Sequence, residues 1–260
     1  MKTAFAGKAV AFLQIFANKI VEISRQLQEF FTNGSFGVAV YPFFMHPIMR
    51  GSARFIVILL AVLLSFIGVF YLFAEFVVNL FSESSVISYF RHTVLELLVP
   101  FGSVAEGKPN YFSPLSHVMS AVFNLQGLGF TIAYLAVIVQ LSRRKYWLLA
   151  LIFAVFFSIG MGLIPTSQAK ITAGGLQNLG ASLTYLFGNL AIILAGIDIV
   201  KPQLEWLRRF SLQAGAVGVL CILVTIFLPN MLTPILERLA IYAVMIWEIV
   251  AGIALLKRKP

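Results

Sequence analysis

The sequence predicts an all-α membrane protein, a polytopic bundle of six transmembrane helices, on the basis of its composition and of its apolar runs. Of the 260 residues, 60% are hydrophobic and only 11% are charged, whereas soluble domains use roughly 25% charged residues. Six apolar runs are each long enough for the roughly 20 helical residues that cross a bilayer core. Open strands cannot satisfy their backbone hydrogen bonds in lipid, so we expect each run to be a helix.

An amphipathic N-terminal segment, residues 1–54, is expected to precede the transmembrane domain of residues 55–260. Apolar residues recur at helical spacing over residues 5–31, at Phe12, Phe16, Ile20, Ile23, Leu27 and Phe30. The opposite face is polar and includes Lys8, Lys19 and Arg25. This pattern is typical of a helix in the membrane interface, and it suits equally a helix docked on the cytoplasmic side of the protein itself. Asn33 and Gly34 are expected to end it.

The six apolar runs cover about residues 55–78, 118–141, 147–164, 176–200, 212–232 and 235–256. Small residues four positions apart recur within several of them, at Gly129 and Ala133, Ser158 and Gly162, Gly180, Thr184 and Gly188, and Ala214 and Gly218. Such spacing favours close helix contacts in membranes. We interpret these residues as packing positions.

The distribution of lysine and arginine predicts the orientation of the bundle. Six lie in residues 1–54, and three each lie in the loops after the second and fourth runs and in the C-terminal tail. The other side holds only Arg91, Lys108, Lys170 and Arg238. By the positive-inside rule, both termini are predicted to be cytoplasmic. The net charge of +9 therefore reflects membrane topology and not nucleic-acid binding.

The connection between the first two runs, residues 79–117, is predicted to be the only long outer loop. Ile87, Phe90, Val94 and Leu97 recur at helical spacing, which predicts a short interfacial helix before Pro100. An irregular stretch is expected over residues 102–114.

Glu248 is the most informative ionisable residue, because a charge at the centre of a membrane costs about 2.5–3.5 kcal/mol. It follows Glu237 by eleven residues, which places both carboxylates on one helix face about 16 Å apart. Glu248 could serve as a proton relay or a cation site. Alternatively, it could fix helix packing through a hydrogen bond to Asn189, Thr225 or a backbone carbonyl.

Three amide side chains, those of Asn124, Gln126 and Asn189, also lie within apolar runs, where their donors and acceptors need partners. Asn124 and Gln126 point to nearly opposite faces of one helix, so at most one of them belongs to a site. The candidate ligand-binding residues are Glu75, Asn189, Glu237, Arg238 and Glu248.

A metal site is a weaker prediction. His92 and Glu96 are four residues apart and His117 precedes the second run, but zinc sites use three or four ligands and the HExxH pattern is absent. The single cysteine, Cys221, excludes an intramolecular disulfide. Because nucleophile-elbow, Walker A and dinucleotide-binding motifs are absent, we expect neither an enzyme nor a cofactor.

Two segments, residues 160–196 (GMGLIPTSQAKITAGGLQNLGASLTYLFGNLAIILAG) and 236–256 (LERLAIYAVMIWEIVAGIALL), carry a family resemblance. With Gly188–Asn189 and the Glu237, Arg238, Tyr242, Trp247, Gly252 series, they resemble the domain-of-unknown-function 998 family of prokaryotic polytopic membrane proteins. The resemblance covers residues 55–260 and implies a six-helix bundle in the prokaryotic inner (cell) membrane. A histidine expected in the turn before the Gly-Asn helix is replaced here by Lys170, Thr172 and Gln177.

The sequence favours two functional hypotheses over a third, a membrane enzyme acting on lipid, for which His92, Glu96 and His117 are the only candidate residues. The first is a protein that binds or moves a small or amphiphilic molecule through a pocket open to the outside, because Glu75, His92, His117, Glu237 and Arg238 gather toward the outer surface. The second is a scaffold or accessory subunit whose N-terminal helix docks a partner membrane protein or a second copy. In both cases membrane lipids surround the helices.

Overall fold

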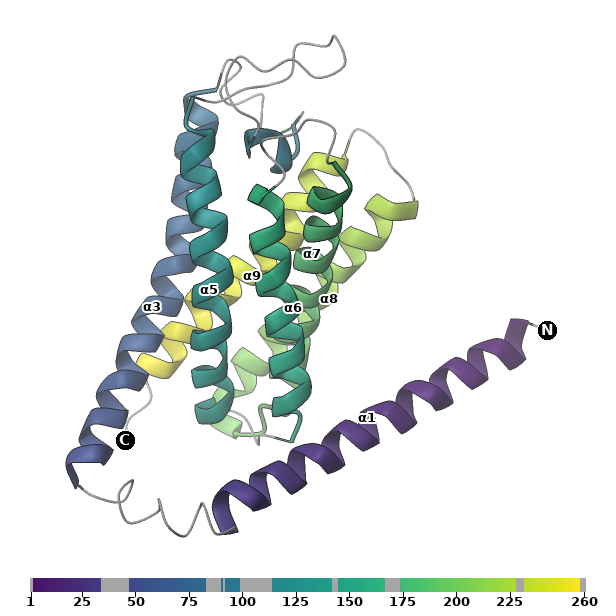
Figure 1. Cartoon of the computed structure of the whole chain (residues 1–260), viewed down its shortest axis with the longest axis vertical. Coiled ribbons are helices and arrows are strands. Elements are labelled where there is room, and N and C mark those ends of the chain that lie inside the picture. Colours follow the sequence, from purple (N-terminus) through teal and green to yellow (C-terminus); the bar gives the residue numbers. More distant parts are fainter. Residues whose placement is uncertain are drawn as a thin grey trace.

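The fold is that of a computed structural model that describes residues 2–33, 47–82, 90, 92–98, 114–141, 145–166, 174–227 and 232–257 (Figure 1). Within these ranges the chain is helical and contains no β-strand. The elements in order are α1 (Lys2–Asn33), α3 (Pro47–Leu80), η2 (Leu95–Leu98), α5 (Ser116–Leu141), α6 (Trp147–Thr166), α7 (Gly174–Asp198), η4 (Pro202–Leu204), α8 (Glu205–Phe227) and α9 (Thr233–Leu256).

Six helices of the described chain, α3 and α5 to α9, are long and apolar enough to cross a membrane. The chain is therefore a multi-pass membrane protein, as predicted. Two boundaries differ from the prediction. Helix α3 begins at Pro47, inside the segment assigned to the N-terminal region. Helix α8 begins at Glu205 and not near residue 212, and the Glu205 carboxylate pairs with Arg208 and Arg209 at 3.3 and 3.1 Å at its start.

The transmembrane helices form a closed ring, and one of them, α9, lies closest to the centre. Each packs against the next in the order α3, α5, α6, α7, α8, α9, and α9 packs against α3. Helix α9 also contacts α5 and α7, so its side chains face four other helices. We call the end of the bundle where α5, α7 and α9 begin the upper end, and the opposite end the lower end, following Figure 1.

Aromatic residues fill the interior of the bundle. Phe130 and Tyr134 of α5 stack on each other, and they contact Phe157 of α6 and Trp247 of α9. The two polar atoms of this group are satisfied, since the Tyr134 hydroxyl donates to the carbonyl oxygen of Ala191 at 2.6 Å. Likewise, Trp247 Nε1 donates to Ser211 Oγ at 2.8 Å. This satisfied core fixes the positions of α5, α7, α8 and α9.

Most of the predicted small-residue positions lie at helix contacts. A Cβ atom added at Gly180 would lie 2.8 Å from the carbonyl oxygen of Gly160, and one added at Gly218 would lie 1.9 Å from Asn189 Oδ1. Gly162 is an exception, because no atom lies within 4 Å of the place of its Cβ. The prediction that Gly162 packs against a neighbouring helix is wrong, because neither α5 nor α7 comes within 4 Å of the place of its Cβ.

The predicted N-terminal helix is present as α1, which lies outside the bundle and contacts α6 at the lower end (Figure 1). Ile20 and Ser24 are buried, whereas Phe12, Phe16, Ile23 and Phe30 are exposed. The contact thus uses only part of the predicted apolar face. Its place in a membrane interface stays a prediction.

The outer loop contains a short helix, as predicted, but η2 covers only Leu95–Leu98, and neither His92 nor Thr93 is helical. Residues 83–89, 91 and 99–113 of the predicted loop lie outside the described residues. Val94, Leu97 and Leu98 are fully buried, so η2 packs onto the bundle. Phe90, which belongs to the earlier part of the predicted helix, is helical and exposed. The carbonyl oxygen of His92 accepts a hydrogen bond from Arg238.

Candidate ligand site in the upper half of the bundle

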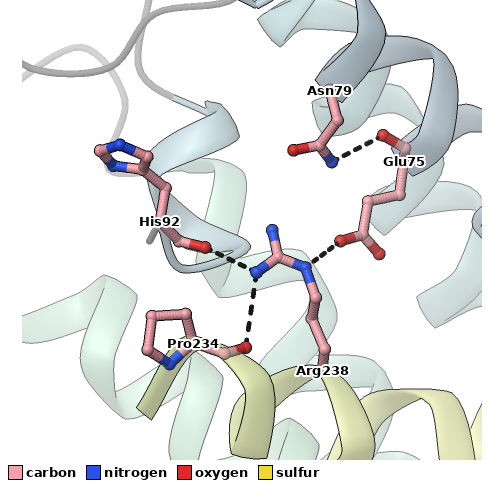
Figure 2. A network of polar contacts seen from close by, with 5 residues as sticks. All are labelled: Glu75, Asn79, His92, Pro234 and Arg238. Carbon is pink, nitrogen blue, oxygen red and sulfur yellow. Dashed lines mark hydrogen bonds and ion pairs between the residues drawn. The ribbon is translucent and has the colours of Figure 1, made fainter. Parts of the chain in front are cut away.

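A buried ion pair joins α3 to α9 in the upper half of the bundle (Figure 2). Arg238 Nε donates to Glu75 Oε1 at 2.8 Å, and both side chains are at most 5% exposed. Arg238 Nη1 also donates to the carbonyl oxygens of His92, at 2.6 Å, and of Pro234, at 3.4 Å. One guanidinium therefore ties together α3, α9 and the segment that precedes η2.

Further polar groups surround this pair, and some have no partner. Tyr71 of α3, Tyr185 of α7 and Tyr242 of α9 lie near the pair, and Tyr242 donates a hydrogen bond to the Glu75 carboxylate. Within the described chain, the Tyr71 and Tyr185 hydroxyl groups and Glu75 Oε2 are buried without a hydrogen-bond partner. Burying such a group unpaired costs free energy, so each one calls for an explanation. We refer to Tyr71, Glu75, Tyr185, Glu237 and Arg238 as the upper polar cluster.

Glu237 joins this cluster through its charge. Its carboxylate interacts electrostatically with Arg238 and with Tyr185, and its Oε2 is buried without a hydrogen-bond partner in the described chain. The cluster thus holds two carboxylates and one guanidinium. Its local charge balance is negative by one when both carboxylates are ionised.

The η2 segment lies next to the cluster at the upper end of the bundle. It packs against α5, and Gln177 Nε2 of α7 donates to the carbonyl oxygen of Leu95 at 3.4 Å. Together with the bond from Arg238 to His92, these contacts hold η2 to three helices. An approach to the cluster from the upper end passes this segment.

Glu248 occupies a different place, deeper in the bundle. It is fully buried, and Gln126 Nε2 of α5 donates a hydrogen bond to its Oε1. The predicted structural partners do not bond to it, because Asn189 Nδ2 donates to the carbonyl oxygens of Tyr185 and Ala240 and Thr225 Oγ1 donates to that of Cys221. Gln126 faces the interior and Asn124 is exposed, which agrees with their predicted opposite faces.

The predicted ligand-binding residues therefore fall into three places. Glu75, Glu237 and Arg238 come together in the upper polar cluster, Glu248 pairs with Gln126, and Asn189 joins α7 to α9 beside Gly218. Sequence reasoning missed Tyr71 and Tyr185. Tyr71 could have been noticed from its position one turn from Glu75 on the same face of α3.

The predicted metal ligands do not form one site. His92 Nδ1 lies 2.5 Å from Glu96 Oε2, whereas His117 is exposed at the start of α5. No group of three histidine, cysteine, aspartate or glutamate side chains that could hold a metal ion occurs among the described residues.

Comparisons of the chain with protein-family models, with curated proteins and with solved structures found no match. The geometry of the side chains is therefore what supports a function.

Proposed function

We propose that this multi-pass membrane protein binds or moves a small or amphiphilic molecule at the upper polar cluster, which the molecule enters from the upper end. The observation that carries the proposal is the set of buried polar atoms without partners, on Tyr71, Glu75 and Tyr185, beside an ion pair. A protein selected only for stability would replace the two hydroxyl groups by hydrogen, as in phenylalanine, because an unpaired buried hydroxyl is costly. A ligand that pairs with them accounts for their presence.

The charge of the cluster indicates the kind of ligand. Glu75 and Glu237 outnumber Arg238, and the four oxygen atoms that are buried without a partner in the described chain, on Tyr71, Glu75, Tyr185 and Glu237, can accept a hydrogen bond. A molecule with a positively charged or donor-rich head group complements such acceptors. An apolar tail on that molecule would lie among the surrounding helices.

The double substitution Tyr71→Phe and Tyr185→Phe tests this proposal. Because neither hydroxyl has a partner in the described chain, we expect the free energy of unfolding to stay unchanged or to rise by up to about 1 kcal/mol. Native mass spectrometry of the protein extracted gently from its own membrane should show a small bound molecule in the native chain and its loss in this variant.

Tyr134→Phe is the matched control. The Tyr134 hydroxyl donates to Ala191, so this variant should lose about 1 kcal/mol of stability and keep the bound molecule. Retention of the same mass by the Tyr71→Phe/Tyr185→Phe variant, or absence of any small molecule from the native protein, would contradict the proposal.

The rival function is that of a scaffold or accessory subunit, favoured by the exposed Phe12, Phe16, Ile23 and Phe30 side chains of α1. Its signature in the same spectra is a co-purifying protein chain that disappears when residues 1–34 are deleted. That result, without a small ligand, would replace the binding function by the scaffold function. Neither function requires a catalysed reaction.

We also propose that the lower end faces the cytoplasm of a prokaryotic cell and that the protein belongs to the domain-of-unknown-function 998 family. The excess of lysine and arginine at the lower end supports the orientation, and the resemblance of residues 160–196 and 236–256 supports the family and the inner membrane.

Single cysteines introduced after Cys221→Ala test this orientation. His117 is exposed at the upper end and Lys145 is exposed at the lower end. A membrane-impermeant maleimide should label a His117→Cys variant in intact cells and a Lys145→Cys variant only after lysis. The reverse pattern would place the termini outside.

A further inference from the structure

Glu248 is buried inside the bundle, and no counter-charge among the described residues acts on it. It is fully buried and lies well inside α9 (Thr233–Leu256), and its partner Gln126 is 1% exposed inside α5 (Ser116–Leu141). Glu248 Oε2 has no hydrogen-bond partner in the described chain. A carboxylate in such a place costs several kcal/mol as an ion and much less as a neutral acid.

No cation among the described residues compensates this carboxylate. Besides burial, the hydrogen bond from Gln126 is the only influence on its ionisation among the described residues. None of the charged or titratable side chains in the described parts of the helices packed around α9 is among the influences on Glu248: Arg54, Tyr71 and Glu75 of α3, His117 and Tyr134 of α5, Tyr185 and Asp198 of α7, and Glu205, Arg208, Arg209 and Cys221 of α8. On α9 itself, Arg238 pairs with Glu75, and Glu237, Tyr242 and Lys257 are likewise absent from the influences on Glu248.

The structure also leaves room for Glu248 on α3. A Cβ atom added at Gly68 would lie 3.1 Å from Glu248 Oε2 and 2.6 Å from the carbonyl oxygen of Met245. Glycine therefore lets α9 approach α3 while the carboxyl group occupies the space beside it. A metal ion would need several further oxygen ligands, whereas a proton needs none.

Gln126 is suited to both protonation states of Glu248. Its NH₂ group donates to the carboxylate, and its carbonyl oxygen accepts a hydrogen bond from the carboxylic acid after the amide turns over. A lysine or arginine partner would hold the carboxylate ionised, and a leucine would leave the ion without a donor. An amide stabilises both forms without adding a charge.

We propose that Glu248 and Gln126 form a proton-binding site, in which the Glu248 carboxylate takes up one proton from water and later returns it. Uptake changes the charge of the site from −1 to 0, and the Gln126 amide reverses its hydrogen bond. Gly68, Tyr71 and Glu75 lie at three- and four-residue spacing along one face of α3, so the upper polar cluster begins about 5 to 10 Å above the site. Proton binding at Glu248 goes beyond the ligand proposed for that cluster and does not depend on it.

Labelling with dicyclohexylcarbodiimide tests this site in the full-length protein in mild detergent. The reagent is apolar and attacks protonated carboxyl groups in apolar surroundings, and peptide mass spectrometry locates the adduct. We expect Glu248 to be labelled at about pH 5, and its labelling to fall about tenfold per pH unit once the carboxyl group ionises. The Glu205→Gln variant, which changes a carboxylate at the lower end, should keep the Glu248 adduct.

Two variants complete the test. The Glu248→Gln variant should lose the adduct from the peptide that contains residue 248. It should also lose the infrared carbonyl band of a protonated carboxylic acid, and the infrared measurement does not require a reagent to reach the site. In the Gln126→Leu variant, labelling should persist to a higher pH, because the ionised form has lost its only donor. The proposal would be overturned if labelling and the carbonyl band both stayed constant from about pH 5 to about pH 9. It would also be overturned if neither labelling nor the carbonyl band were observed. If the native protein fails this test but retains a small molecule, the proposed proton site is refuted and the proposed ligand site is not affected.

Discussion

Replacing Arg238 by methionine is expected to lower the free energy of unfolding by about 3–5 kcal/mol, because the substitution leaves Glu75 buried without its cation. Arg238 Nε lies 2.8 Å from Glu75 Oε1 at a site that water hardly reaches. The variant also removes the donor to the His92 carbonyl oxygen, so the η2 segment should loosen. Unfolding in mixed micelles with increasing sodium dodecyl sulfate measures the loss.

A double-mutant cycle separates the ion pair from the bulk of the side chains. Adding Glu75→Met to Arg238→Met removes the uncompensated carboxylate, and we expect most of the lost stability to return. An Arg238→Met variant that is as stable as the native protein would show that Glu75 is neutral and not paired. An additive cycle would show that the two side chains do not interact.

The fold could be predicted from the sequence because a bilayer imposes a length and a composition on each crossing. The run that forms α9, for example, matches the predicted range to within a few residues at its start and at its end. The start of α8 could not be predicted in this way. Arg208 and Arg209 are charged and resemble loop residues, but they lie in the first turns of α8, where both pair with Glu205.

The candidate sites depend on contacts that lie far apart in the sequence. Glu75 and Arg238 are separated by 163 positions and Gln126 and Glu248 by 122, and hydropathy does not indicate which helices are neighbours. The contact between α5 and α9 decides that Gln126, and not Asn189 or Thr225, bonds to Glu248. Tyr71 and Tyr185 are aromatic and resemble ordinary packing residues until the structure shows that their hydroxyl groups have no partner in the described chain.

The packing of α3 against α9 is what places both sites, and Gly252 is its tightest point. A Cβ atom added there would lie 2.5 Å from the carbonyl oxygen of Ala61 and 2.1 Å from Ser65 Oγ. The serine side chain can rotate away, but the backbone oxygen cannot move without moving α3. The two helices therefore approach as closely as glycine allows.

The Gly252→Leu variant should consequently lose about 3 kcal/mol of stability, because the added side chain forces α3 and α9 apart. Gly162→Leu is the matched control, since nothing lies within 4 Å of the place of its Cβ, and it should unfold like the native protein in the same micelles. Equal stability of both variants would mean that α3 and α9 are not packed at this distance.

Because Glu248 lies one turn from Gly252 on α9, separating the helices admits water to its carboxyl group. As the pH is raised, carbodiimide labelling of Glu248 should therefore disappear at a lower pH in the Gly252→Leu variant than in the Gly162→Leu variant. This result would show that the proton site depends on the contact between α3 and α9.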